Sequence, residues 1–269
     1  MKIFKTIRPT TSSQRGLKIL QKDFLAKWKP LKSLSSGLLK RSGRNNYGRI
    51  TAYHRGGGHK RLYRSIDFYR TSTSGIVEAI EYDPNRTAFI ARLFDSTQKI
   101  HSYILAPKNL FVGAIVKSGD QAEIKVGHAL PLAKIPQGSL IHNLSLNLSQ
   151  KGQYARSAGT YAQLLQKTKG FARVRCSSGE QLLVPLSAFA TLGVVSNENN
   201  NLLTLGKAGR SRWKNWRPHV RGVAMNPVDH PHGGGEGKTS GGRPSVTPWG
   251  KPTKGPKTSR SRNPFRIKS

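Results

Sequence analysis

Residues 76–94 read IVEAIEYDPNRTAFIARLF, and their pattern is that of a β-hairpin. Two apolar segments, 76–82 and 87–94, flank the tetrapeptide Asp83-Pro84-Asn85-Arg86. Proline presets a turn value of φ and asparagine tolerates turn conformations, so the tetrapeptide predicts a tight turn. The stretch therefore predicts two neighbouring strands joined by a short connection.

Further short strands are expected on the C-terminal side of this hairpin. Apolar and polar residues alternate over 144–149 and over 171–176, which is the period of a half-buried strand. Ser177–Glu180 supplies a turn before a strand at 181–186. Other candidate strands are 100–105, 114–117, 123–126, 160–166 and 202–205. Many short strands with frequent glycine and proline favour small β-barrels and leave little room for long helices.

The body is expected to contain two β-barrels. Pro131–Gly138 carries two prolines and a glycine and is typical of a connector between them. The single cysteine, Cys176, alternates with Phe171, Arg173 and Arg175 on the side of Ala172 and Val174. We expect it to be a small buried side chain rather than a nucleophile.

Positive charge is concentrated at the two ends of the chain. The chain has 46 Lys and Arg against 12 Asp and Glu, a net charge of +34. Residues 1–75 carry +16, residues 207–269 carry +13, and the middle 131 residues carry only +5. Basic arms of this kind need a polyanion, and nucleic acid binds them by releasing its condensed counterions. We therefore expect two cationic arms that bind nucleic acid.

Composition excludes other classes of protein. No apolar run approaches the roughly 18 residues of a membrane-spanning helix, so no membrane partner is expected. One cysteine excludes a disulfide scaffold and a four-thiolate zinc site.

The C-terminal arm, residues 207–269, holds 10 glycines and 8 prolines and is expected to be extended. It also carries Trp213, Trp216 and Trp249. These rings either stack on unpaired bases or pack onto the β-body, and both alternatives stay open.

Two motifs invite a chemical interpretation. Arg55–Lys60 contains three consecutive glycines but lacks the Gly-Lys-Ser/Thr ending of a nucleotide-binding loop. We interpret it as a flexible basic loop whose glycines allow close approach to an RNA backbone. The second motif, Asn226–Gly237, holds Asp229, His230, His232 and Glu236. Pro231 separates the histidines and no helix fixes their spacing, so hydrogen-bond donation from the two rings to RNA is favoured over a metal site.

Several motifs together resemble the L-two family of universal large-subunit ribosomal proteins. They are Gly43–Asn46, Gly48–Thr51, Gly56–Lys60, Glu81–Arg86, Tyr103–Lys108, Ala155–Thr160, Gly206–Gly209 and Arg221–Lys238. The resemblance covers about residues 40–258, and Met225–Gly237 is its most specific part. It implies a mainly β fold, with an oligonucleotide-binding (OB) barrel followed by an SH3-like barrel and long basic arms at both ends.

Domain boundaries follow from the resemblance and the connector. We predict a basic N-terminal extension over 1–59, the OB domain over 60–133, the SH3-like barrel over 134–206 and the Gly/Pro-rich basic arm over 207–269.

The resemblance also implies a role. The chain is expected to be a structural constituent of the large subunit that binds its rRNA near the peptidyl transferase centre and supports assembly, subunit association and peptide-bond formation. The implied chemistry belongs to rRNA, so no catalytic residue, protein-held metal or cofactor is expected, and Mg²⁺ enters only through rRNA. The implied partners are large-subunit rRNA, other large-subunit proteins and the small subunit across an intersubunit bridge, with one copy of the chain per ribosome.

Residue types and resemblance together assign contacts to particular positions. His230 matches the histidine implicated in supporting peptidyl transfer, and we interpret it as an organiser of the centre. The predicted RNA-binding residues are Arg44, Arg49, His54, Arg55, Gly56, Gly57, Gly58, His59, Lys60, Arg61, Arg64, Arg86, Arg156, Lys207, Arg210, Arg212, Trp213, Arg221, Asn226, His230, His232, Lys238, Trp249 and Lys251.

Some regions depart from the family's pattern. Residues 1–39 match it poorly, 196–203 is atypical, and the tail after Pro256 is sparsely similar, so these regions are expected to meet lineage-specific RNA or protein neighbours. Residues 238–252 resemble alphaproteobacterial and mitochondrial members. Met1–Lys29 has the composition of a transit peptide, with eight basic residues and one acid, but the chain starts at Met1. We expect an organelle-encoded chain or a retained N-terminus in a mitochondrial ribosome, with a plastid or the bacterial cytoplasm as alternatives.

Two other classes of function compete with this interpretation. Charge alone permits a histone-like protein that compacts DNA, but such a protein would favour simple repeats or helices with Lys-rich tails, and the specific Gly/His loops argue against it. The second competing class is a metal-dependent RNA-processing enzyme. It would use Asp229, His230, His232 and Glu236, and it predicts a stoichiometrically bound metal ion.

Overall fold

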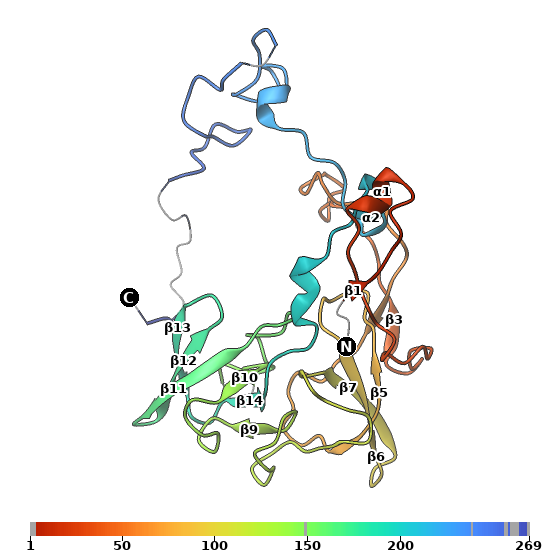
Figure 1. Cartoon of the computed structure of the whole chain (residues 1–269). Helices are drawn as coiled ribbons and strands as arrows, with labels where there is room; N and C mark the ends of the chain where they lie inside the picture. Colours follow the sequence, from red (N-terminus) through yellow and green to blue (C-terminus); the bar gives the residue numbers. More distant parts are fainter. Residues whose placement is uncertain (1–3, 148–149, 238, 256–257, 259–263, 268–269) are drawn as a thin grey trace. The chain divides into compact units, whose positions relative to one another are not determined.

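The computed structural model describes residues 4–147, 150–237, 239–255, 258 and 264–267. Its regular structure is mainly short β-strands, as predicted, with helices of six residues or fewer (Figure 1). The described residues fall into two compact units. The first unit contains both large sheets and spans 1–39, 60–207 and 263–269, while the second combines 40–59 with 208–262.

The first sheet contains the predicted hairpin. Its strands are β5 (Gly75–Glu81), β6 (Ile90–Asp95), β7 (Ile100–Leu105) and β8 (Ile115–Val116), in the antiparallel order β7-β6-β5-β8. The register shifts between Val77 and Ala79, an irregularity of the kind that increases sheet curvature. Val77, Leu93 and Ile104 are fully buried in one hydrophobic core, which is consistent with a small barrel of the OB type.

The second sheet has six antiparallel strands and forms the SH3-like part. They are β9 (Ala129–Pro131), β10 (Leu140–His142), β11 (Ala162–Thr168), β12 (Phe171–Cys176), β13 (Gln181–Pro185) and β14 (Phe189–Leu192), in the order β13-β12-β11-β10-β14-β9. β12 confirms the predicted alternation, because Ala172 and Val174 are buried. Cys176 packs at the edge of this core, and burial raises the pKa of its thiol, with a further rise from the Glu180 carboxylate. Such a thiol is a poor nucleophile.

Smaller elements accompany the two sheets. β1 (Phe4–Lys5) pairs with β2 (Ile19–Leu20), and β3 (Ser35–Gly37) pairs with β4 (Leu62–Arg64), so much of residues 1–39 belongs to the first unit. The helices are α1 (Ser12–Arg15) and α2 (Ala208–Trp213), with 3-10 turns η1 (Glu198–Leu202) and η2 (Gly222–Ala224). Among the residues that the structure describes, none of the helices has the length and apolar character needed to cross a membrane.

Three predicted strands were wrong. Within the described part of the chain, residues 123–126 pair with no neighbouring strand, and their apolar side chains, Ile124 and Val126, are about half exposed. At 202–205 the chain instead finishes η1 and makes one β-bridge, between Thr204 and Lys18. In both places the local pattern is that of a strand, but among the described residues it gains at most one β-bridge and no ladder with a partner strand.

The third wrong strand is 144–149. Leu144 makes a single β-bridge to Tyr154, and both Leu144 and Leu146 are buried as expected. Ser145 is buried as well, because its hydroxyl donates to the Phe189 carbonyl (3.1 Å) and accepts from the Phe189 N–H (2.9 Å). Ser145 therefore does not face solvent as the alternation predicts, and 148–149 lie outside the described residues.

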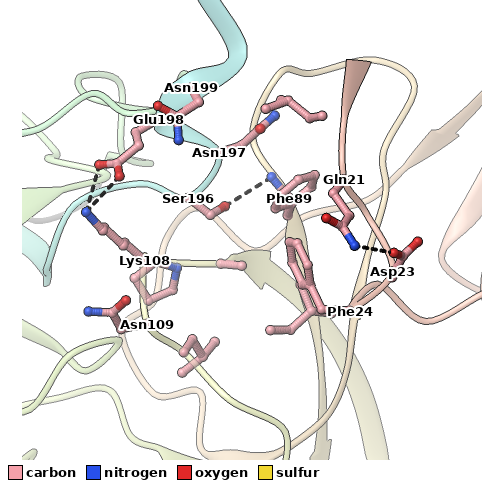
Figure 2. A pocket seen from close by; sticks show the side chains of 15 residues that line it. Gln21, Asp23, Phe24, Phe89, Lys108, Asn109, Ser196, Asn197, Glu198 and Asn199 are labelled. Atoms are coloured by element: carbon pink, nitrogen blue, oxygen red, sulfur yellow. Dashed lines mark hydrogen bonds and ion pairs between the residues drawn. The ribbon is translucent and has the colours of Figure 1, made fainter. Parts of the chain in front are cut away.

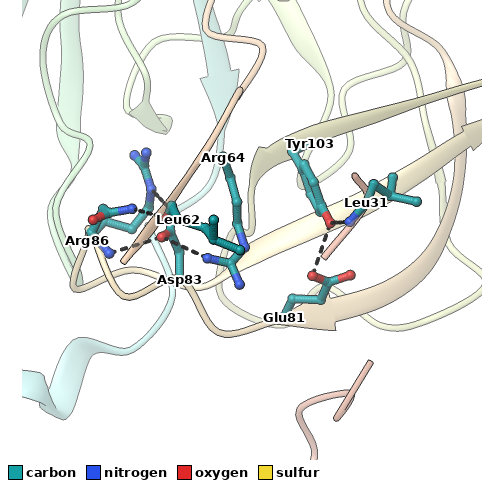
Figure 3. Close-up of polar contacts among 8 residues, drawn as sticks. Leu31, Leu62, Arg64, Glu81, Asp83, Arg86 and Tyr103 are labelled. Atoms are coloured by element: carbon teal, nitrogen blue, oxygen red, sulfur yellow. Dashed lines mark hydrogen bonds and ion pairs between the residues drawn. The ribbon is translucent and has the colours of Figure 1, made fainter. Parts of the chain in front are cut away.

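A buried ion cluster fixes the turn that follows β5 (Figure 3). Asp83 is fully buried and contacts the guanidinium groups of Arg86 (2.7 Å) and Arg64 (3.4 Å). It also accepts the Asn85 N–H at 3.0 Å. The turn residue Asp83 thus ties β4 to the hairpin by charge as well as by backbone geometry.

A second polar cluster attaches the N-terminal segment to the same sheet (Figure 3). The Tyr103 hydroxyl donates to Glu81 and accepts the Leu31 N–H, both at 3.1 Å. Arg92 pairs with Glu81 and donates to the Lys29 carbonyl at 3.1 Å. Residues 29–31 are therefore held on the sheet by groups that are themselves nearly or fully buried.

His142 makes the stability of the first unit depend on pH. Burial lowers the pKa of its imidazole from 6.5 to about 4; the hydrogen bond to the Gly193 carbonyl opposes this shift and the charge of Arg70 adds to it. The unfolded chain binds this proton below about pH 6.5 and the folded chain does not until about pH 4. Stability is therefore full above pH 6.5 and falls by roughly 3 kcal/mol as the pH drops to 4. Denaturant unfolding of the native chain and His142→Gln at several pH values checks this, and equal pH slopes would contradict it.

Candidate nucleic-acid interface

The second unit brings the two arms together by backbone hydrogen bonds. Within its N-terminal part, the Asn45 side-chain oxygen accepts the N–H groups of Tyr47 and Arg49, each at 3.0 Å. The Gly43 carbonyl accepts the Thr51 and Ala52 N–H groups at 2.9 and 3.0 Å. These bonds close the chain over 43–52 into a loop and leave the side chains of Arg44 and Arg49 exposed.

The triple-glycine loop lies against the end of α2. The Gly56 N–H donates to the Asn215 carbonyl (3.2 Å), and the His59 N–H donates to the Trp213 carbonyl (3.3 Å). A Cβ at Gly58 would lie 2.7 Å from the Asn215 backbone nitrogen, so this position has no room for a side chain. The close approach predicted toward RNA is made at Gly58 to the chain's own backbone.

Gly57 differs from its neighbours. It has a φ of +74°, and its Cβ direction is open. A cavity of about 560 Å³ is lined by Gly57, Gly58, His59, Arg212 and Trp213. The indole of Trp213 is 60% exposed, so bare backbone, a cation and an aromatic ring meet at this surface.

Two histidines join the arms next to this loop. The ring nitrogens of His54 and His219 are in hydrogen-bond contact, with ring centroids 4.0 Å apart. His54 Nδ1 also lies 3.2 Å from the Pro218 carbonyl, and the Arg217 N–H donates to the His54 carbonyl at 2.9 Å. His54 therefore has a role in holding the two arms together.

His230 is the buried centre of the C-terminal loop. Its side chain packs so closely under Gly222 that a Cβ there would meet the ring at 2.6 Å. The His232 N–H donates to His230 Nδ1 at 3.0 Å, so in the neutral ring the proton is on Nε2. The turn around it is fixed by the Asn226 carbonyl, which accepts the N–H groups of Asp229 (3.0 Å) and His230 (3.2 Å).

His232 has a similar internal role. Its Nε2 accepts the Val246 N–H at 3.2 Å, and its ring lies 4.7 Å from that of His230. Val246 in turn bridges to Pro252. One nitrogen of each ring thus accepts a hydrogen bond that orders the loop, so the predicted donation to RNA falls to the other nitrogen of each ring.

The four residues of the alternative metal-dependent enzyme do not form a common site. Asp229 and Glu236 are exposed, whereas His230 is buried. Throughout the described ranges, no three His, Cys, Asp or Glu side chains are placed as a metal ion requires.

A second cationic and aromatic surface lies on the first unit. A cleft of about 670 Å³ includes Phe68, Tyr69, Arg86, Lys151 and Arg156 in its lining. The Arg156 guanidinium lies 4.6 Å from the Phe68 ring centroid and donates to the Gly152 carbonyl at 3.2 Å. Guanidinium groups beside aromatic rings are typical of sites for phosphate and unpaired bases.

The cleft also shows what sequence reasoning missed. Tyr63, Tyr69 and Lys151 line it, although none was among the predicted contacts. Basic residues flanking the two tyrosines, in Arg61–Arg64 and Tyr69-Arg70, were the available signal. Arg64, by contrast, was predicted to bind RNA but is buried against Asp83.

The remaining predicted residues sort by exposure. Exposed side chains or backbone are Arg44, Arg49, Arg55, Gly57, His59, Lys60, Lys207, Arg212, Trp213, Arg221, Asn226, Trp249 and Lys251. His54, Gly58, Arg61, Arg86, Arg156, Arg210 and His232 are partly exposed, and Gly56, Arg64 and His230 are buried. Lys238 lies outside the described residues.

Comparison with known proteins gives consistent matches along the chain. Residues 31–118 match the family model "Ribosomal Proteins L2, RNA binding N-terminal domain", and 125–250 match "Ribosomal Proteins L2, C-terminal domain". The large ribosomal subunit protein uL2 of Rickettsia felis is 57% identical over 260 residues, covering 96% of this chain and 95% of that protein. The uL2 protein of Rickettsia canadensis is 56% identical over 261 residues, with the same coverage.

Proposed function

The chain belongs to the L2 family of large-subunit ribosomal proteins, and from this we propose that it binds large-subunit rRNA next to the peptidyl transferase centre. The observation that carries the proposal is the second unit. There the two basic arms are tied together by backbone bonds and directed outward at Arg44, Arg49, Arg55, Arg212 and Arg221. Main-chain bonds fix the shape, so the cationic side chains are left to meet phosphates.

Each surface has a proposed contact. Trp213 and the glycine backbone at 57–58 take an unstacked base, with Arg212 on its phosphate. The cleft at Phe68, Arg86 and Arg156 takes a second segment of RNA. Magnesium enters through rRNA phosphates, and the chain acts as a single copy beside other large-subunit proteins, with a contact to the small subunit across a bridge.

His230 is proposed to position rRNA without reacting. Its Nδ1 is occupied by the His232 N–H, which leaves Nε2–H to donate to RNA. The peptide bond is formed by rRNA, and the loop supports the geometry of that centre. The cellular location is proposed to be a mitochondrial ribosome; the compared relatives are bacterial, which favours the bacterial cytoplasm over a plastid as the alternative.

Removal of the His230 ring tests the proposed site. In large subunits carrying His230→Ala, peptide-bond formation or the yield of mature subunits should fall roughly tenfold, the effect of one lost, well-placed hydrogen bond. His230→Gln keeps an acceptor for the His232 N–H and should retain part of the activity. His101→Ala, in the first unit, is the control. Subunits with His230→Ala that assemble in normal yield and react at the native rate would contradict the role.

A further inference from the structure

An apolar cleft in the first unit belongs to none of these surfaces (Figure 2). It has a volume of about 300 Å³, and its walls come from Leu20, Gln21, Asp23 and Phe24, from the chain around Pro107, and from Ser196–Asn199. Phe24 meets Phe89 edge to face, with centroids 5.5 Å apart. The Phe24 side chain is nevertheless 52% exposed, so an apolar ring is accessible to solvent at the entrance of an apolar cleft.

The walls of the cleft are held in place by polar contacts (Figure 2). The Phe89 N–H donates to the Ser196 hydroxyl at 3.1 Å, which attaches the η1 segment to the first sheet. Lys108 Nζ contacts both carboxylate oxygens of Glu198 at 2.8 Å, and Gln21 donates to Asp23 at 2.7 Å. The cleft is therefore already formed in the chain without a partner, and this preorganisation lowers the conformational free-energy cost of binding a partner there.

The charge of the cleft is opposite to that of the chain. Its lining carries Asp23 and Glu198 against Lys108 alone, a net charge of −1 in a protein of +34. Lys108 is paired with Glu198, so the Asp23 carboxylate carries the net charge of the lining; this charge disfavours a phosphate group, and an apolar floor gains little from a sugar-phosphate backbone. A positively charged segment with a large apolar side chain fits both features.

We propose that this cleft docks a basic segment of another ribosomal protein, which inserts an apolar side chain beside Phe24 and sets a flanking Lys or Arg against Asp23. The proposal rests on the proposed ribosomal role of the chain. Burial of one large apolar side chain contributes a factor of roughly ten or more in the dissociation constant of that partner.

Photo-cross-linking identifies the occupant. The full chain with p-benzoylphenylalanine in place of Phe24 is incorporated into large subunits in cells, and the isolated subunits are irradiated. The expected product joins position 24 to a Lys- or Arg-containing peptide of another large-subunit protein. The same photoprobe at Leu39, which is 92% exposed and outside the cleft, is the control. A product with rRNA, no intermolecular product, or the same protein from position 39 overturns the proposal.

Substitutions give an independent readout. Phe24→Ala, and separately Asp23→Lys with Glu198→Lys, should raise the dissociation constant of the cross-linked protein about tenfold or more in salt-washed subunits. Phe111→Ala is the matched control, because Phe111 is 67% exposed and does not line the cleft. Unchanged retention in the cleft variants overturns the docking proposal while the chain itself still sediments with the subunit. Loss of the native chain from the subunit instead contradicts the ribosomal role.

Discussion

Raising the salt concentration from 50 to 200 mM should weaken binding of the chain to large-subunit rRNA by about a thousandfold or more. The expectation follows if six to ten phosphates are contacted, since each contact releases condensed counterions whose dilution drives binding. The second unit alone exposes Arg44, Arg49, Arg55, Arg212 and Arg221, which makes this number reasonable for the whole chain. Filter binding or fluorescence anisotropy over a salt series measures it.

The arm residues should account for part of that slope. Replacement of Arg49, Arg55 and Lys60 by Gln should lower the slope of log affinity against log salt by roughly two to three. As a control, Lys117, Lys125 and Lys134 are exposed on the β-body, and their replacement by Gln should change the slope much less. A native slope near zero would contradict an electrostatic interface.

Asp83→Ala should destabilise the first unit by about 3–5 kcal/mol, the usual cost of removing one partner from a buried ion pair. Asp83 is fully buried, and its loss leaves Arg64, whose side chain is only 10% exposed, as an uncompensated charge. The Asn85 N–H loses its acceptor in the same step. Chemical denaturation monitored by circular dichroism at neutral pH gives the free energy of unfolding.

A surface pair provides the control for Asp83. Glu123 and Lys125 also form an ion pair, but both side chains are more than half exposed. Glu123→Ala should therefore destabilise the first unit much less than Asp83→Ala does. If the two substitutions lower the free energy of unfolding equally, the buried Asp83 cluster contributes no more to stability than a surface ion pair.

Local patterns predicted the sheets well where strand partners lie close in sequence. The hairpin of β5 and β6, β7 and the β12–β13 pair were all found within a few residues, since alternation and turn chemistry act over short distances. Residues 123–126 have a similar pattern but pair with no strand among the residues that the structure describes, and the sequence of a single segment cannot reveal this. Pairing, more than propensity, separated the correct predictions from the wrong ones.

Contacts between residues far apart in the sequence could not be predicted from composition or local patterns. The two basic ends were expected as separate arms, yet residues 40–59 and 208–262 form one unit through bonds such as that between Gly56 and Asn215. Arg64 and Asp83 are 19 positions apart, and their burial together depends on the pairing of β3 with β4. The motif around His230 was recognisable in sequence, but the packing of its ring under Gly222 was not.

Sedimentation through a sucrose gradient in Mg²⁺ tests the central claim most directly. Lysate from cells or organelles that express the chain is separated, washed in high salt and probed for the protein. The account predicts that the chain migrates with the large ribosomal subunit and stays there after the wash. A peak at the top of the gradient, or release together with genomic DNA, would contradict it.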